Sequence, residues 1–189
     1  MKDLKIRTNF KIENAVEDDK FLNIDGYACH WNVRNLNDEI VDENSFDTFF
    51  QMYGDGKLKP ALNYNHTDLI IGGIDTIERK YDGLFISCHL NKDVRECRDS
   101  IIPNILAGDI TGFSTEGFIK NGFDGVDFND DGSYYVRDFL LTAVAVVSTP
   151  ADWDAQFSVK NYVNENPDLV KELIDKQKEE KSINPLLFL

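Results

Sequence analysis

Short runs of alternating apolar and polar residues recur along most of this chain and end at glycine, proline, asparagine or aspartate. Side chains of a strand point alternately to its two faces, so this spacing predicts strands with one buried face. The alternation is clear in Leu84, Ile86, Cys88 and Leu90, and the run 140–147 is the most apolar of the chain. The predicted strands cover residues 4–12, 21–31, 60–66, 70–74, 75–78, 84–90, 117–119, 134–136 and 140–147.

Three segments carry the start and stop signals of helices. The first covers residues 46–53 and follows Ser45, whose hydroxyl is suited to cap a helix. The second runs from residue 91 or 93 to 106, and Pro103 should kink or break it. The third covers residues 167–181, with its lysines in the last turns, where the helix dipole favours positive charge.

Strands outnumber helices and do not alternate with them one for one, which disfavours a doubly wound parallel sheet. Residues 14–20 are predicted to form a charged turn and residues 121–133 an acidic loop without the spacing of a calcium-binding loop. We therefore predict a mostly β (α+β) fold: a small, largely antiparallel β-barrel or sandwich with peripheral helices. One domain is expected over residues 1–160, followed by a C-terminal helix and apolar tail over 161–189.

The charge balance narrows the choice of partners. The chain has 189 residues, with 34 acidic and 20 basic side chains and a formal net charge of −14. Proteins that bind nucleic acid are usually basic, so no nucleic-acid partner is expected. The apolar runs are too short to span a bilayer, and the first residues lack a secretion signal. We expect no membrane partner and a cytosolic setting, in which the three cysteines are reduced thiols.

Two of the three histidines directly follow a cysteine, as Cys29-His30 and Cys88-His89. Such pairs suggest zinc, but adjacent strand residues point to opposite faces, so each pair could supply only one ligand. Cysteines that alternate with apolar neighbours are more typical of a core than of a nucleophile. No metal ion and no cofactor are therefore expected.

The strongest candidates for chemistry are Ser114 and His66. Ser114 lies in the glycine-rich stretch 108–118, where the backbone can approach another chain closely. His66 follows Asn65 at the predicted end of a strand, and its ordinary pKa suits proton transfer at neutral pH. A serine hydroxyl becomes a nucleophile when a histidine removes its proton, so the two residues together predict a serine hydrolase if the fold unites them.

Several short motifs, in order, resemble the prohead (procapsid maturation) serine proteases of tailed phages. They are Asp25-Gly26-Tyr27-Ala28, Asp38-Glu39-Ile40-Val41 with Ser45-Phe46, Asn65-His66 with Ile71-Gly72, Gly83-Leu84, the stretch 108–118, and Val144 to Val147 with Pro150-Ala151. The resemblance covers roughly residues 21–158. It implies a β-barrel ringed by helices, like that of the herpesvirus assemblin proteases.

The same resemblance implies an endopeptidase with Ser114 as nucleophile and His66 as general base. Its substrates would be capsid and scaffold proteins inside the viral procapsid, in the host cytoplasm. It leaves open self-cleavage of the chain and assembly into a homo-oligomer.

One position departs from the family pattern. Many members carry an acidic residue in the closing strand about seven residues before the proline, and this chain has Ala143 there. The group that would orient His66 is therefore left open, and the alternatives are Asp68, Glu116, Asp138 and a second histidine, His30 or His89.

This departure keeps two other functions open. One is a capsid-associated or scaffold-binding module of the same fold without turnover. The other is an unrelated β-barrel binding protein, which would require Ser114 and His66 to lie far apart. The apolar end, residues 186–189, is expected to dock on a partner chain or to mark a self-processing product, unless it is simply a loose end packed on its own domain.

Overall fold

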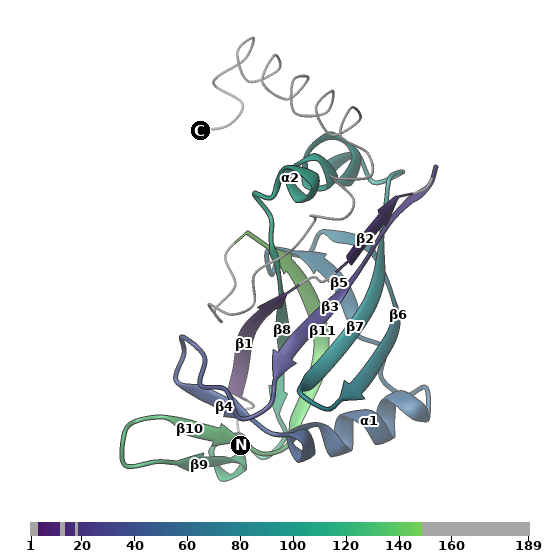
Figure 1. Cartoon of the computed structure of the whole chain (residues 1–189). Coiled ribbons are helices and arrows are strands. Elements are labelled where there is room, and N and C mark those ends of the chain that lie inside the picture. Colours follow the sequence, from purple (N-terminus) through teal and green to yellow (C-terminus); the bar gives the residue numbers. More distant parts are fainter. Residues whose placement is uncertain (1–3, 12–13, 18, 149–189) are drawn as a thin grey trace.

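A single curled sheet of eight strands dominates the computed structural model, which describes residues 4–11, 14–17 and 19–148 (Figure 1). All neighbouring strands are antiparallel except β5 and β11, which are parallel. In spatial order the strands are β1 (Leu4–Lys11), β8 (Gly112–Ile119), β11 (Phe139–Val147), β5 (Ala61–Tyr64), β6 (Ile70–Lys80), β7 (Gly83–Asn91), β3 (Phe21–His30) and β2 (Asn14–Glu17).

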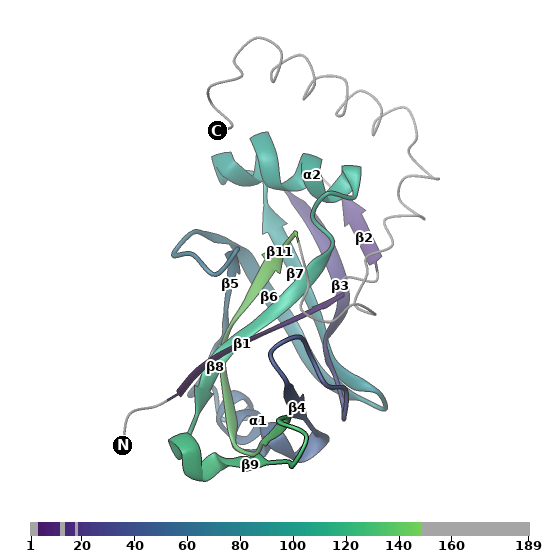
Figure 2. The same ribbon diagram turned by 90° about the vertical axis from the view of Figure 1, so that its left-hand side faces the viewer.

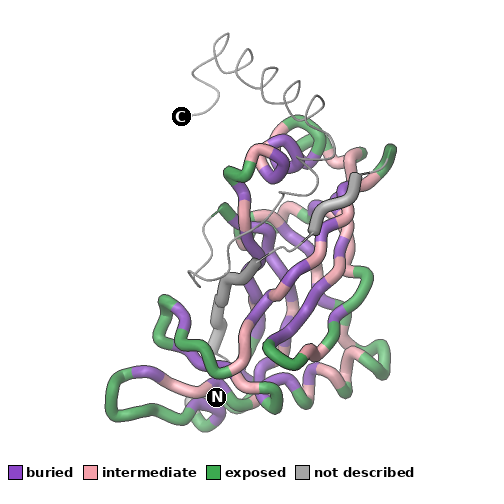
Figure 3. Tube along the Cα trace, viewed as in Figure 1, coloured by how far each residue is buried: buried purple, intermediate pink, exposed green. Residues whose placement is uncertain are grey.

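The sheet curls strongly enough to bring β1, at one edge, close to β3, next to the other edge (Figure 2). The apolar residues of the alternating strands line the inside of this curl and form one core, which is seen as the buried segments in Figure 3. Leu22 and Ile24 of β3, Ile86 and Leu90 of β7, and Phe113 of β8 are among its members. The prediction of a mostly β, largely antiparallel α+β fold is confirmed.

Short helices close the two ends of the curl. A 3-10 turn (Glu43–Phe46) and α1 (Asp47–Gly54) lie at one end, and α2 (Ile102–Ala107) lies at the other (Figure 1). A second, three-stranded sheet in the order β4 (Glu39–Val41), β10 (Tyr134–Val136) and β9 (Val126–Phe128) lies near α1. A further 3-10 turn covers Gly122–Gly125.

The two helix predictions that fall on described residues hold with small shifts. The segment 46–53 is helical, but Ser45 is not its cap: Asp42 caps the preceding 3-10 turn, and Ser45 returns the hydrogen bond as its partner in a capping box. Pro103 lies in the first turn of α2, directly after a π-helical turn, Cys97–Ile101. The predicted irregularity is therefore present, because proline lacks an N–H and its ring clashes with the preceding turn.

Three loop predictions were wrong. Residues 14–17, predicted as part of a charged turn, form β2 and pair with β3. Residues 126–128, predicted as loop, form β9. The strand predicted at 117–119 begins at Gly112 and contains Ser114. β2 and β9 pair with the strands that directly follow them, β3 and β10, in hairpins whose short arms are rich in polar residues and read as turn or loop. Only the first half of β8 depends on partners far away in sequence, β1 and β11.

The predicted domain boundary at residue 160, the helix 167–181 and the apolar tail 182–189 lie outside the described residues. All three stay predictions.

Candidate active site

His66 lies in the turn that joins β5 to β6. Asn65 and His66 both have a positive φ, of 54° and 60°, a region that non-glycine residues enter only when their surroundings require it. The Asn65 N–H donates to the Val146 carbonyl at 3.1 Å, and the Thr67 N–H and Oγ–H donate to the Tyr64 carbonyl at 3.0 Å and 2.6 Å. These bonds hold the turn, and with it the histidine, beside β11.

Ser114 is the third residue of β8, inside the sheet rather than in a loop. Its Cα partners are Asn9 on β1 and Ala145 on β11. The preceding Phe113 belongs to the core, so Ser114 and, two residues on, Glu116 point to the opposite face of the strand. Ser114 is fully buried on that face.

The structure brings Glu116, not Ser114, into direct contact with the His66 ring. His66 Nδ1 lies 3.2 Å from Glu116 Oε2, and only 12% of each side chain is exposed. An ionised carboxylate can only accept a hydrogen bond, so the contact requires the hydrogen on Nδ1. When the imidazole is neutral, the other ring nitrogen, Nε2, then carries the lone pair that a general base needs.

The Ser114 hydroxyl has no hydrogen-bond partner among the described residues. His66 and Ser114 are therefore not hydrogen-bonded in this structure, although they meet the same short segment of β8. Residues two apart in a strand have Cα atoms about 6.7 Å apart. Ser114 thus lies about 6.7 Å along the strand from Glu116, the residue that contacts the imidazole.

Glu116 lies beside the position in the closing strand where this chain lacks an acid. Its Cα partner on β11 is Ala143, the position at which the family pattern places an acidic residue. A carboxylate thus reaches the histidine from the neighbouring strand in the same row. The sequence left Glu116 as one alternative among several, because its strand was predicted to begin only at residue 117.

The other four candidates for the orienting group either contact a different side chain or lie in an exposed turn or a pocket. His89 Nδ1 is 2.8 Å from Asp75 Oδ1. Asp138 lies just before the far end of β11 and is 3.6 Å from Lys120 Nζ. Asp68 is exposed in the turn that follows His66.

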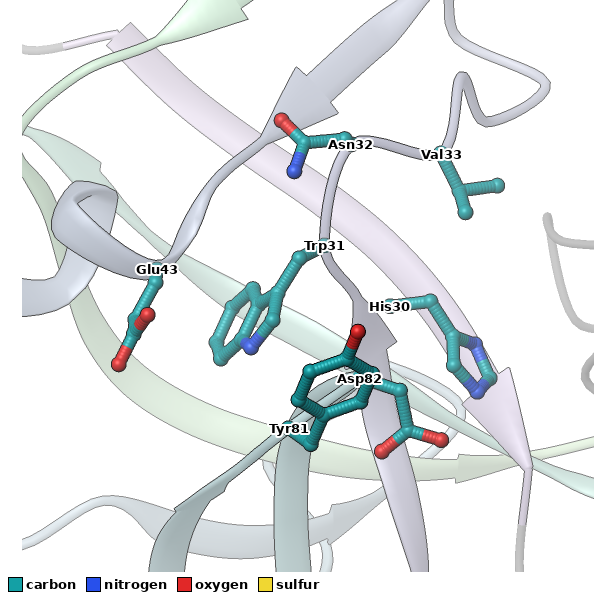
Figure 4. A pocket seen from close by; sticks show the side chains of 7 residues that line it. All are labelled: His30, Trp31, Asn32, Val33, Glu43, Tyr81 and Asp82. Carbon is teal, nitrogen blue, oxygen red and sulfur yellow. The ribbon is translucent and has the colours of Figure 1, made fainter.

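His30, the remaining candidate, lines a pocket at the end of β3 (Figure 4). This pocket measures about 570 Å³ and is also lined by Trp31, Asn32, Val33, Glu43, Tyr81 and Asp82. β6 separates it from the His66 turn, and an 11-residue strand spans about 35 Å. The pocket therefore belongs to the opposite end of the sheet from Ser114.

The cysteines are part of the core, as predicted. Cys29, Cys88 and Cys97 are buried free thiols. Burial raises the pKa of Cys97 to about 12 and that of Cys88 well above its usual range, which keeps both protonated. In the part of the chain that the structure describes, no group of three or more His, Cys, Asp or Glu residues is placed to hold a metal ion.

Within the same described ranges, none of the helices has the length and apolar character needed to cross a membrane.

The fold is similar to the solved structure of the capsid assembly protease gp21 of bacteriophage T4, with a TM-score of 0.63 and 16% sequence identity. The match covers 79% of this chain and 100% of that one, and at this identity it shows the fold alone. No curated protein matches the chain. The model of the caudovirus prohead serine proteases matches residues 8–168, a range that contains His66, Ser114 and Glu116. The chain therefore belongs to the caudovirus prohead serine protease family.

Proposed function

We propose that this chain is a serine endopeptidase that cleaves capsid and scaffold proteins inside the phage procapsid, with Ser114 as nucleophile and His66 as general base. The observation that carries the proposal is the contact of His66 Nδ1 with Glu116 on the face of β8 that also bears Ser114. Family membership and the likeness to a capsid assembly protease support the choice of substrates.

The roles follow from the chemistry of the three groups. Glu116 accepts the Nδ1–H, fixes the tautomer and stabilises the imidazolium that forms during the reaction. His66 Nε2 takes the proton of Ser114 as Oγ attacks the substrate carbonyl, and returns it to the leaving amine. The resulting acyl-enzyme is then hydrolysed by water, with His66 acting again as the base. Glu116 is therefore a positioning residue, not a group that touches the substrate.

The reaction needs an opening step. Ser114 is fully buried, and its hydroxyl has no partner among the described residues, so a substrate can reach it only after this face of the sheet becomes accessible. Catalytic hydrogen bonds are often long or absent without substrate and tighten in the complex. We expect the bond between Ser114 and His66 to form on substrate binding.

Co-expression with the capsid and scaffold proteins of the same phage tests this function. The Ser114→Ala chain should leave these proteins uncleaved, while the Ser87→Ala control, a serine of β7, should process them normally. Cleavage that persists in the Ser114→Ala chain would refute the assignment. Self-cleavage, which the resemblance leaves open, would appear in the same extracts as a shortened chain that the Ser114→Ala variant does not produce.

A second function, binding to capsid or scaffold proteins without turnover, is favoured by one observation. The hydroxyl of Ser114 is buried without a partner among the described residues, as in a site that no longer reacts. This alternative predicts that the wild-type chain also leaves the co-expressed proteins intact while it co-purifies with them.

A further inference from the structure

Two buried polar atoms on the face of the sheet that bears Ser114 have no hydrogen-bond partner in the described part of the chain. They are Asn63 Oδ1 and Ser114 Oγ. Asn63 is 6% exposed and Ser114 is fully buried. Nearly all buried polar atoms in folded proteins are hydrogen-bonded, so two exceptions in one place need an explanation.

The two residues belong to one row that crosses three strands. Ala145 of β11 is the Cα partner of Ser114 on β8 and of Asn63 on β5. Residues in one row project to the same face of a sheet, so the asparagine and the serine flank the small side chain of the alanine. Two strand spacings place their Cα atoms about 10 Å apart.

The neighbouring row also has a small side chain, an alanine, at its centre. Ala143 is the Cα partner of Glu116 on β8 and of Ala61 on β5. The two rows together form a floor of alanines, with Ser114 and Glu116 along one side and Asn63 on the other. Both Ala143 and Ala145 are buried, so a peptide backbone can lie on this floor only after the opening step, and a longer side chain at position 143 would then obstruct it.

We propose that Asn63 accepts a hydrogen bond from a backbone N–H of the substrate, about three residues from the bond that is cleaved. The amide oxygen is an acceptor, and a peptide supplies N–H donors at regular intervals. An extended chain advances about 3.3 Å per residue. When the substrate carbonyl lies at Ser114 and the substrate runs across the strands, an N–H about three residues from it therefore faces Asn63 across Ala145.

The placement of Asn63 also links binding to catalysis. His66 follows it by three residues, in the turn at the end of the same short strand. One segment thus offers the acceptor that holds the substrate and the imidazole that activates Ser114. This inference rests on the proposed function, because it takes Ser114 as the nucleophile.

Binding of modified peptides tests the inference. The probe is a peptide that spans a cleavage site mapped on the processed capsid protein, with a parallel series in which each backbone nitrogen in turn is methylated. Affinities are measured by titration calorimetry on the inactive Ser114→Ala chain and on the same chain with Asn63→Ala. We expect Asn63→Ala to weaken binding of the parent peptide about tenfold.

At one position, N-methylation should weaken binding of the peptide to the Ser114→Ala chain about as much as Asn63→Ala does. In the chain that carries both substitutions, the same methylation should cause no further loss of affinity. The Asn44→Ala control, an exposed asparagine near α1, should leave every affinity unchanged. Losses that add independently at all positions, or no measurable binding of the parent peptide, would overturn the inference. Processing that still depends on Ser114 would then leave the proposed function intact.

Thermal melting separates this role from a structural one. Replacing an unpaired buried acceptor by an apolar group of similar shape relieves a desolvation cost. Asn63→Leu should therefore raise the melting temperature or leave it unchanged while it weakens peptide binding. A clear drop in melting temperature would show that the amide supports the fold and would contradict the assignment.

Discussion

Replacing Glu39 with glutamine should stabilise the protein at alkaline pH and much less at acidic pH. Glu39 begins β4 and is only 4% exposed. Burial raises the pKa of its carboxyl group from 4.5 to about 7, although hydrogen bonds from neighbouring side chains favour the carboxylate. The folded protein therefore binds this proton more tightly than the unfolded chain does.

The sign follows from linkage. A raised pKa in the folded state means that the stability associated with this group is complete below pH 4.5 and is lost as the pH rises through about 7. A difference of about 2.5 pH units at 1.36 kcal/mol each gives a loss of about 3 kcal/mol at pH 8. At pH 5 the loss is only about 1 kcal/mol. The larger value is a substantial fraction of the usual 5–15 kcal/mol stability of a domain.

Glutamine can keep the hydrogen bonds that Glu39 makes with Asn35 and Tyr134. Asn35 Nδ2 donates to Glu39 Oε2 at 2.9 Å, and the Tyr134 hydroxyl donates to Oε1 at 3.1 Å. A glutamine can accept from Asn35 with its oxygen and donate to Tyr134 with its nitrogen, because a hydroxyl group is both donor and acceptor. The substitution therefore removes the buried charge and keeps a partner for Asn35 and for Tyr134.

Urea unfolding at pH 5 and pH 8 measures the effect. Glu39→Gln should raise the unfolding free energy by about 3 kcal/mol at pH 8 and by about 1 kcal/mol at pH 5. Glu78→Gln, the same change at an exposed position of β6, is the control and should shift neither value appreciably. Equal effects of Glu39→Gln at both pH values, or a loss of stability at pH 8, would refute the reasoning.

Three further substitutions test the packing and the strand register of the fold. Ser45→Ala should lower the unfolding free energy by about 1–2 kcal/mol in urea melts. It removes a capping hydrogen bond and the buried 2.6 Å hydrogen bond from Ser45 Oγ to the Val136 carbonyl. An unchanged free energy would contradict the capping box. Phe49→Ala should cost about 3–5 kcal/mol, since this fully buried ring packs on other aromatic rings of the first helical segment, and a loss below 1 kcal/mol would mean that the ring is not in the core. Gly117→Ala would place a methyl group against the Leu140 carbonyl oxygen and disturb the pairing of β8 with β11. It should therefore lower both the melting temperature and the protease activity, and wild-type values of both would contradict this register.

Much of the fold can be predicted from the sequence because most strands carry their own alternation of apolar and polar residues. Leu84 to Leu90 is an example, and it forms β7 as expected. Residues 14–17 are too short and too polar to show such a pattern, and they become a strand through the hairpin with β3. Residues 112–116 depend on β1 and β11, which lie far away in sequence, so local spacing cannot reveal that strand.

Some residues of the candidate site can likewise be predicted from the sequence, and others require the structure. Ser114 and His66 could be selected from residue type and resemblance, and the structure places both at the same region of the sheet. Choosing Glu116 among the alternatives requires the register of β8 against β11, which is a long-range property. The role proposed for Asn63 requires in addition the parallel pairing of β5 with β11, which the prediction of a largely antiparallel sheet did not suggest.

The central claim is that His66 activates Ser114 as a nucleophile, and covalent labelling tests it most directly. The purified chain is treated with a fluorophosphonate, and the modified residue is located by mass spectrometry of its peptides. Our account predicts an adduct on Ser114 in the wild-type chain and the loss of this adduct in the His66→Ala chain. An unlabelled Ser114 in a folded chain that cleaves its capsid substrate, or labelling that persists without the imidazole, would contradict it.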